Sequence, residues 1–231
     1  MDKQKNKYYY LKGIKNGMPI CLGYLAVSFT LGITARNAGM TAWQAMLTSL
    51  ACNASAGQYA GFTVIAAGGS YFEMILMELV ANARYLLMSC SLSQKFSSET
   101  GLLHRMLVGY DVTDEIFGVA VSEPGKLNPF YNYGMMTVAI PGWSLGTFFG
   151  VIMGNILPAN IVSALSVGLY GMFLAIIIPP ARKSKVIAAL VTISMVSSYI
   201  FSRLPVISNI SSGIRTIILT VVIAGIAAVL F

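Results

Sequence analysis

The chain has 231 residues, of which only 10% are charged, whereas about 25% of the residues in a typical soluble protein are charged. Hydrophobic residues make up 56% of the chain, and its mean hydropathy is +0.74. So few charges cannot cover a water-exposed surface, which excludes a soluble globule and indicates an all-α, polytopic membrane helix bundle.

Long uncharged windows predict the membrane-spanning helices. A helix needs about 20 apolar residues to cross a bilayer core of about 30 Å, so the window from residue 127 to residue 181 must hold two helices. We expect clear spans at residues 19–36, 42–67, 71–93, 130–154, 158–179, 186–204 and 213–231. With residues 106–122 as an ambiguous element, the bundle has about seven or eight membrane segments, one or more of them broken or re-entrant.

Basic residues cluster outside these spans, in residues 1–16 and again in residues 182–185. The positive-inside rule places both clusters in the cytoplasm. The first apolar stretch is long and many spans follow it, so we expect an uncleaved first span rather than a signal peptide. We therefore predict a basic cytoplasmic tail at 1–16 and one transmembrane domain at 17–231. Membrane topology explains the net charge of +7 without a nucleic-acid partner.

The second predicted span carries small and polar residues from Asn53 to Gly61. Glycines and polar side chains such as Asn53, Ser55 and Gln58 can let a helix unwind and present its backbone to a ligand. Small residues also permit close helix packing, with hydrogen bonds between helices. The sequence leaves both interpretations open.

The third predicted span contains Glu78, Asn82 and Arg84. Ionisable groups inside a membrane cost about 2.5–3.5 kcal/mol each and face a partner or water. Glu78 and Asn82 share a helical face, while Arg84 points about 120° away from Glu78, so we expect the partner of Arg84 on another element. The charges form either a structural ion pair or part of a substrate or ion pathway.

Residues 106–122 include Asp111, Asp114 and Glu115, whose spacing of three and four residues predicts one carboxylate-bearing helical face. This cluster could bind an ammonium group, carry a coupling proton or neutralise Arg84. If the segment lies at the surface instead, the cluster is a solvated face.

The two cytoplasmic clusters require an even number of crossings between them, but only five clear spans lie there. One solution makes 106–122 a full polar span, which leaves Lys95, His104 and Arg105 outside. The other makes both 53–67 and 106–122 re-entrant or broken, which returns those cations to the cytoplasm. Either solution implies a cavity, because irregular backbone at membrane depth must be buried by protein or line water.

Glycines recur every four residues after Pro141, at Gly142, Gly146, Gly150 and Gly154. Such spacing is typical of a helix-packing face. Its partner could be another span, a second copy of the chain or a separate subunit.

The inventory of reactive residues argues against an enzyme. His104 is the single histidine, and Cys21, Cys52 and Cys90 are far apart within apolar segments, so we predict no metal site, cofactor or disulfide framework. Asp111 and Asp114 lie one helical turn apart, which is poor geometry for an aspartyl protease.

Three motifs in this order resemble the AzlC family of branched-chain amino acid permeases: the runs AGQY at 56–59, NARYLL at 82–87 and TDEIF at 113–117. The likeness covers nearly the whole chain. It implies a transporter that exports leucine, isoleucine, valine and similar amino acids, including methionine, across a bacterial inner membrane with a small AzlD-type membrane subunit. The run from Cys52 to Ala56 departs from the more apolar, glycine-bearing run expected there, so the resemblance leaves the substrate open.

A zwitterionic substrate requires a cation for its carboxylate, an anion for its ammonium group and an apolar wall for its side chain. We expect Arg84 to anchor or balance negative charge and Asp114 and Glu115 to engage the ammonium group or a coupling proton. Asn82 and Gln58 would orient the substrate, and Glu78 and Asp111 belong to the same candidate site. The alternatives are an intramembrane enzyme and a non-transporting scaffold. A homo-oligomer is compatible with the transporter and with both alternatives.

Overall fold

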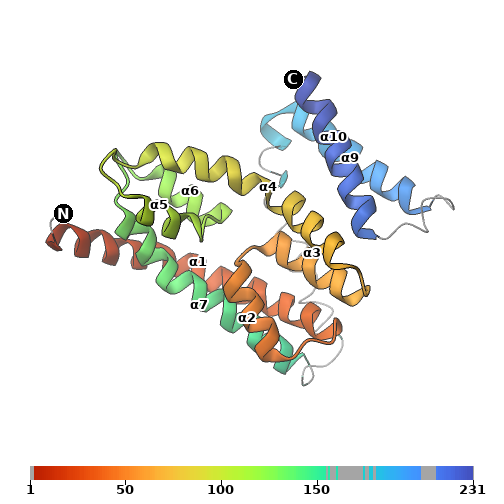
Figure 1. Cartoon of the computed structure of the whole chain (residues 1–231), viewed down its shortest axis with the longest axis horizontal. Helices are drawn as coiled ribbons and strands as arrows, with labels where there is room; N and C mark the ends of the chain where they lie inside the picture. Colours follow the sequence, from red (N-terminus) through yellow and green to blue (C-terminus); the bar gives the residue numbers. More distant parts are fainter. Residues whose placement is uncertain are drawn as a thin grey trace.

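A computed structural model describes residues 3–154, 181–203 and 212–230, with isolated positions at 156, 160, 174, 177 and 178 (Figure 1). Among these residues, all regular secondary structure is α-helical, apart from one isolated β-bridge between Phe96 and Leu127. The helices are α1 (Lys3–Asn37), α2 (Ala42–Cys52), α3 (Ser55–Ala66), α4 (Tyr71–Lys95), α5 (Leu102–Gly109), α6 (Asp114–Ser122), α7 (Pro129–Met153), α9 (Lys185–Arg203) and α10 (Ser212–Leu230).

Helices α1, α4, α7 and α9 are long and apolar enough to cross a membrane, and the apolar stretch of α10, Ile214–Leu230, is shorter. This confirms an all-helical membrane architecture. The predicted span at 158–179 lies outside the described residues apart from a few isolated positions, so the total of seven or eight segments stays a prediction.

Helices α1 and α7 pack in parallel along their lengths. Gly13 and Gly17 of α1 lie against Tyr131 and Met135 in the first two turns of α7, and Gly32 lies against Gly150 near the ends of both helices. A Cβ atom on Gly150 would overlap the carbonyl oxygen of Phe29, so only glycine allows the backbones to approach this closely. The regular glycine spacing of α7 therefore serves packing against α1 of the same chain. At the end of this face, Gly154 lies near the side chain of Arg36.

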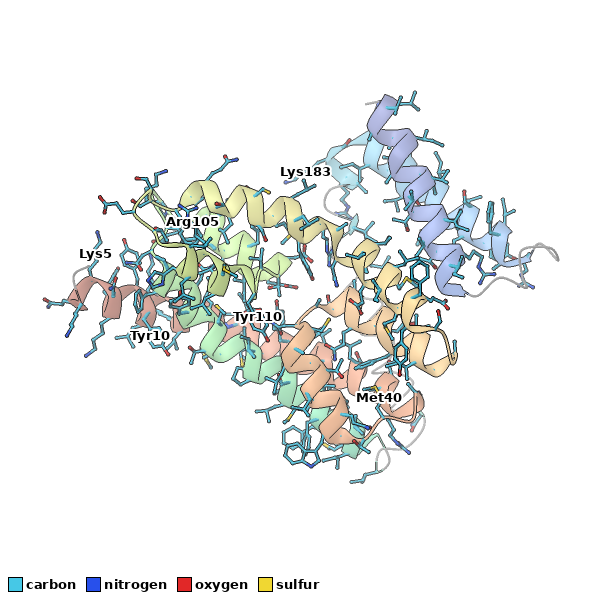
Figure 2. All side chains as sticks on the ribbon, in the orientation of Figure 1. Lys5, Tyr10, Met40, Arg105, Tyr110 and Lys183 are labelled. Atoms are coloured by element: carbon cyan, nitrogen blue, oxygen red, sulfur yellow. The ribbon has the colours of Figure 1, made fainter. Side chains whose placement is uncertain are left out.

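The basic segment at the N-terminus is helical from Lys3 onward and continuous with the first span. Lys12 forms a 2.6 Å ion pair with Glu123, and this hydrogen bond raises the pKa of Lys12 above its ordinary value. Arg105 donates to backbone carbonyls at the end of α4, at the same end of the bundle as Lys5 (Figure 2). The cations of this region therefore gather where α1 and α7 begin.

The predicted single span at 42–67 is wrong, because the helix breaks at Asn53. Asn53 adopts a left-handed conformation with φ 40°, and its N–H caps α2 by bonding to Ser49. After an extended Ala54, α3 turns back, so that Gln58 bonds to the Ser49 side chain at 2.5 Å. Helices α2 and α3 thus form a re-entrant hairpin that starts at the end of the bundle where α1 ends.

A second hairpin enters from the opposite end. Residues 106–122 do not form one continuous helix: α5 ends at Gly109, and α6 begins at Asp114. After α6, Glu123 returns to Lys12 and to the end of α4 through its contact with Lys95. The structure therefore matches the alternative in which both segments are re-entrant or broken. Lys95 contacts Glu123, the partner of Lys12, and His104 contacts Tyr133 near the start of α7, so both lie with Arg105 at the basic end.

The chain repeats one arrangement in opposite directions. A long helix and a hairpin, α1 to α3, are followed by a second long helix and hairpin, α4 to α6, and α4 runs antiparallel to α1 (Figure 1). The tips carry the related sequences Asn53-Ala-Ser55 and Asp111-Val-Thr113. Asn53 contacts Asp111, as expected when equivalent residues meet near a pseudo-two-fold axis.

Candidate functional site at the hairpin tips

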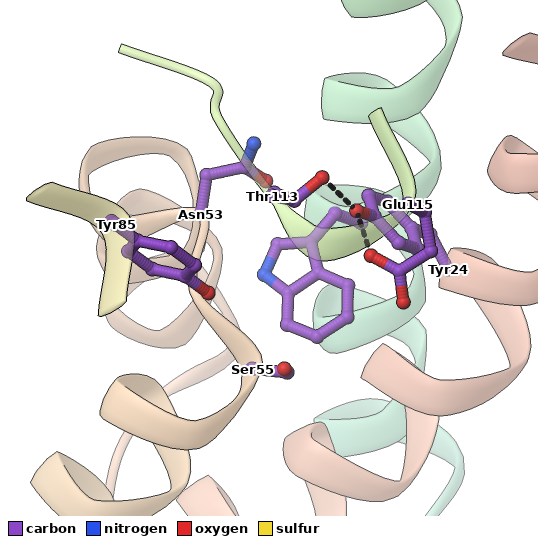
Figure 3. Close-up of a pocket in the computed structure, with 7 residues that line it drawn as sticks. Tyr24, Asn53, Ser55, Tyr85, Thr113 and Glu115 are labelled. Carbon is purple, nitrogen blue, oxygen red and sulfur yellow. Dashed lines mark hydrogen bonds between the residues drawn. The ribbon is translucent and has the colours of Figure 1, made fainter. Parts of the chain in front are cut away.

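A small cavity of about 10 Å³ lies where the hairpin tips meet α1, α4 and α7 (Figure 3). This volume is near the smallest that holds one water molecule, so the site is closed to an amino acid in this conformation. Polar and aromatic side chains line it: Tyr24, Asn53, Ser55, Tyr85, Thr113, Glu115 and Trp143.

Glu115 supplies a carboxylate to this cavity. The hydroxyl of Tyr24 lies 2.8 Å from Glu115 Oε2 and 2.5 Å from Thr113 Oγ1 (Figure 3). Thr113 also caps α6 by accepting a hydrogen bond from the backbone of Ile116. Glu115 lies in the first turn of α6, at the positive end of the helix dipole.

Trp143 forms one wall of the cavity and is held by a buried chain of hydrogen bonds. Its indole N–H donates to Gln58 Oε1 at 2.8 Å, and Gln58 Nε2 donates to Ser49, which lies 2.7 Å from Thr147 Oγ1. Its ring also packs edge-on against Tyr24, with centroids 5.2 Å apart. Both ends of the Gln58 amide are therefore engaged in positioning Trp143, and Gln58 does not line the cavity.

Arg84 pairs with Asp114, so its partner lies on another element, as the helical geometry predicted. Arg84 Nη2 lies 3.0 Å from Asp114 Oδ2, yet the N–H geometry does not make a hydrogen bond, and Nε also has no acceptor. Buried donors normally find acceptors. The guanidinium therefore retains donor capacity for an additional anion.

Glu78 and Asn82 face the α2–α3 hairpin. Asn82 Nδ2 donates to Glu78 Oε2 at 2.8 Å, and Asn82 Oδ1 is buried without a donor. Gly57 on α3 fits against this pair, since a Cβ atom there would lie 2.5 Å from both Asn82 Nδ2 and Glu78 Oε2. The pair therefore fixes α3 on α4 next to the tip.

The prediction of one carboxylate-bearing helical face is wrong. Asp111 lies before α6 begins, because the chain reverses between Tyr110 and Thr113. The three carboxylates consequently reach three different partners: Asp111 reaches Asn53, Asp114 reaches Arg84, and Glu115 reaches Tyr24.

Comparison with known proteins shows the family. A family model described as AzlC protein matches residues 19–157, which include both hairpins and α7. The chain belongs to the AzlC family.

Several similar proteins are named as membrane proteins. An uncharacterized membrane protein of Archaeoglobus fulgidus is 30% identical over 182 residues, which cover 78% of this chain and 80% of that protein. The inner membrane protein YgaZ of Escherichia coli is 25% identical over 150 residues, covering 63% of this chain and 61% of YgaZ. An uncharacterized membrane protein of Helicobacter pylori is 24% identical over 153 residues, covering 63% and 66%. No solved structure matches the chain.

The three motifs that resemble the AzlC family converge in space. The first lies on α3, the second on α4 and the third at the start of α6, and all three border the cavity or its supporting contacts. Among the described residues, no three His, Cys, Asp or Glu side chains gather closely enough to hold a metal ion.

Tyr24 and Trp143 are the site residues that the sequence did not reveal. Both occur in apolar spans, where an aromatic side chain is indistinguishable from one that faces the core or lipid. One sequence feature could have indicated Trp143. It is adjacent to Gly142, so it lies beside the glycine face and close to the helix that packs there.

Proposed function

We propose that this AzlC-family membrane protein transports zwitterionic amino acids with apolar side chains, and that the hairpin tips form the substrate site. The substrate class is leucine, isoleucine and valine, with methionine as a further member, and the direction is export from the cell. The protein would act as the large subunit of a two-component exporter.

The observation that carries this proposal is the pairing of opposite charges beside an aromatic-walled cavity at the meeting point of two re-entrant hairpins. Glu115 offers a carboxylate for the ammonium group, and Arg84 has unfilled donors for the carboxylate. Tyr24, Tyr85 and Trp143 supply an apolar wall. Broken helices that meet at mid-membrane are a common basis of transporter sites.

The closed cavity implies that the tips move apart to admit substrate. Transporters open such sites alternately to the two sides of the membrane. The hairpins enter from opposite ends of the bundle, which suits this motion. Each tip would block the access of substrate along the other hairpin until the tips separate.

A bacterial inner membrane with a cytoplasmic N-terminus is the proposed location. The cations near the beginning of α1 and α7 support this orientation under the positive-inside rule. The Escherichia coli relative is named an inner membrane protein, in agreement with this location.

A small AzlD-type membrane subunit is the proposed partner. The glycine face of α7 is occupied by α1, so this subunit would dock elsewhere. Helix α5 presents the exposed apolar side chains Leu102, Leu103 and Met106, which lipid or a partner must cover.

The test is the release of leucine, isoleucine, valine and methionine from cells preloaded with dipeptides, with this chain expressed alone and together with its small partner. Release that requires both proteins supports the two-component exporter. No release of any of the four, with both proteins present in the membrane, contradicts the proposed substrate class.

Charge variants separate a substrate site from a structural ion pair. Arg84→Gln is expected to lower release by about thirtyfold, because removing one member of this half-buried charge pair leaves the Asp114 carboxylate without its cation, at a cost of about 2 kcal/mol. Lys126→Gln is the control, because Lys126 is exposed at the basic end. If Arg84→Gln combined with Asp114→Asn restores release, the pair is only structural and the substrate site lies elsewhere.

A further inference from the structure

The contact between the two tips has an unusual composition. Asp111 is 1% exposed and Asn53 is 4% exposed, and the Asn53 side-chain amide donates to Asp111 Oδ1. A buried carboxylate normally requires a cation or several donors. Here the described side chains supply one amide donor, so the ionised form of Asp111 would be poorly compensated.

Two further atoms of this pair have no partner. Asp111 Oδ2 and Asn53 Oδ1 are both buried without a hydrogen bond. Asp111 Oδ2 belongs to the same carboxyl group as Oδ1, and Asn53 Oδ1 belongs to the same amide as Nδ2, so both atoms lie beside the existing hydrogen bond. Both are acceptors when Asp111 is ionised, so they cannot satisfy each other.

One proton satisfies both atoms. When Asp111 Oδ2 carries a proton, it can donate to Asn53 Oδ1 while Asn53 Nδ2 continues to donate to Asp111 Oδ1. The result is a neutral, cyclic acid–amide pair with two hydrogen bonds. Loss of the proton leaves a buried anion and two facing acceptors, which favours separation of the tips.

The charged and titratable groups around Asp111 agree with this arrangement. Tyr24 from α1 and Tyr110 and Glu115 from its own hairpin interact with Asp111, and Cys52 from α2 interacts with Tyr110. From α4, Arg84 is paired with Asp114 and Glu78 is bonded to Asn82. Arg84 is the one cation among these groups, and no ion pair joins it to Asp111.

We infer that Asp111 and Asn53 form a proton-binding latch, which holds the two re-entrant hairpins together when Asp111 is protonated and releases them when the proton leaves. The O–H bond of Asp111 breaks on opening, and the proton passes to water on the side to which the site opens. The role of this latch rests on the proposed function: release of one proton from Asp111 accompanies the entry of one amino acid into the site.

Trp143 provides a direct measure of the latch. The chain has two tryptophans, and Trp43→Phe leaves Trp143, which lines the tip cavity together with Asn53. The emission of Trp143 is measured in purified, reconstituted protein from about pH 5 to pH 9, a range that includes strongly perturbed carboxyl groups. The expected result is a pH-dependent change that Asp111→Asn abolishes and the exposed control Glu99→Gln retains.

Asn53→Leu is the second variant and acts from the other hairpin. It removes the amide that both hydrogen bonds require, so it should also abolish the pH-dependent change in emission. Retention of the full change in either Asp111→Asn or Asn53→Leu overturns the latch, whether or not the other variant folds.

Leucine exchange across vesicles gives opposite expectations for the two variants. The amide introduced by Asp111→Asn keeps a donor for Asn53, so this variant should exchange leucine at every pH at the slow rate that the unmodified chain shows in acid. Asn53→Leu cannot latch and should exchange at every pH at the fast, alkaline rate. Equal slowing of exchange by both variants at every pH indicates a merely structural contact and overturns the latch.

The same vesicles distinguish this inference from the proposed function. Leucine exchange without a pH-dependent change in Trp143 emission overturns the latch and leaves the transporter proposal standing. A change in emission that both variants abolish, without exchange of any amino acid even when the small AzlD-type subunit is reconstituted with the chain, supports the latch and overturns the substrate proposal.

Discussion

The two re-entrant hairpins have the same outline but opposite characters. The α2–α3 hairpin brings uncharged polar groups and glycines, and Gly57 and Gly61 fit directly against the side chains of α4. The α5–α6 hairpin brings three carboxylates, and its glycines, Gly109 and Gly118, have open space around them. One hairpin is therefore fixed on α4 by close packing at its glycines, and the other carries the charge.

This difference indicates how a nearly symmetric arrangement acquires a direction. Equivalent tips with identical chemistry would have no reason to respond differently to a proton or an ammonium group. An amide at Asn53 opposite an acid at Asp111 makes one hairpin the responder and the other its fixed partner. The following variants test this division.

The largest expected difference is between charged and uncharged residues that line the same cavity. Glu115→Gln should lower leucine transport by about thirtyfold, since a hydrogen bond to a charged group is worth about 2 kcal/mol. Ser55→Ala should lower it by about fivefold, in line with about 1 kcal/mol for a neutral group. Initial transport rates at matched amounts of membrane protein measure both, and equal losses would remove the distinction between the hairpins.

Glycine substitutions should change stability in opposite directions. Gly57→Ala places a Cβ atom 2.5 Å from Glu78 Oε2 and Asn82 Nδ2, and overpacking of this kind costs about 1–3 kcal/mol. Gly118→Ala meets no atom within 4 Å among the described residues, and alanine favours a helix by up to about 1 kcal/mol. Melting temperatures in detergent compare the two. A Gly57→Ala protein as stable as the unmodified chain would show that α3 is not fixed on α4.

The smallest expected effect concerns Gln58, which the sequence suggested as a substrate contact and the structure places behind Trp143. Gln58→Leu leaves the buried indole N–H without its acceptor, which should cost about 1 kcal/mol of stability. The same change in a Trp143→Phe background should cost less, because no N–H is left unpaired. Equal costs in both backgrounds would contradict the positioning role and return Gln58 to the list of substrate contacts.

Local sequence features predicted a good part of this architecture. Hydropathy located α1, α4, α7 and α9, because apolar length decides whether a helix can cross a bilayer. Helical geometry separated Arg84 from Glu78 and correctly assigned the partner of Arg84 to another element. The two basic clusters require an even number of membrane crossings between them. This requirement left residues 106–122 as either a full span or a re-entrant or broken segment, and in the second case residues 53–67 had to be re-entrant or broken as well.

The breaks within the hairpins were harder to locate. Residues 42–67 look like one span because their hydropathy is continuous, and the small and polar residues from Asn53 to Gly61 are compatible with either a break or close packing. The prediction of one carboxylate-bearing face is wrong because helical spacing applies only within a continuous helix, and Asp111 lies before α6 begins.

The sequence by itself determined the class of the protein, four of its long apolar helices and its family motifs, because apolar length and short motifs are local properties of the chain. Only the tertiary structure decided that Asn53 meets Asp111, that Trp143 rests on Gln58 and that Tyr24 reaches Glu115. These pairings join segments separated by as many as 91 residues, and they depend on the direction that the chain takes after each break. Hydrophobic periodicity carries no information about that direction, because it records which face of a helix is apolar and not where the next helix goes.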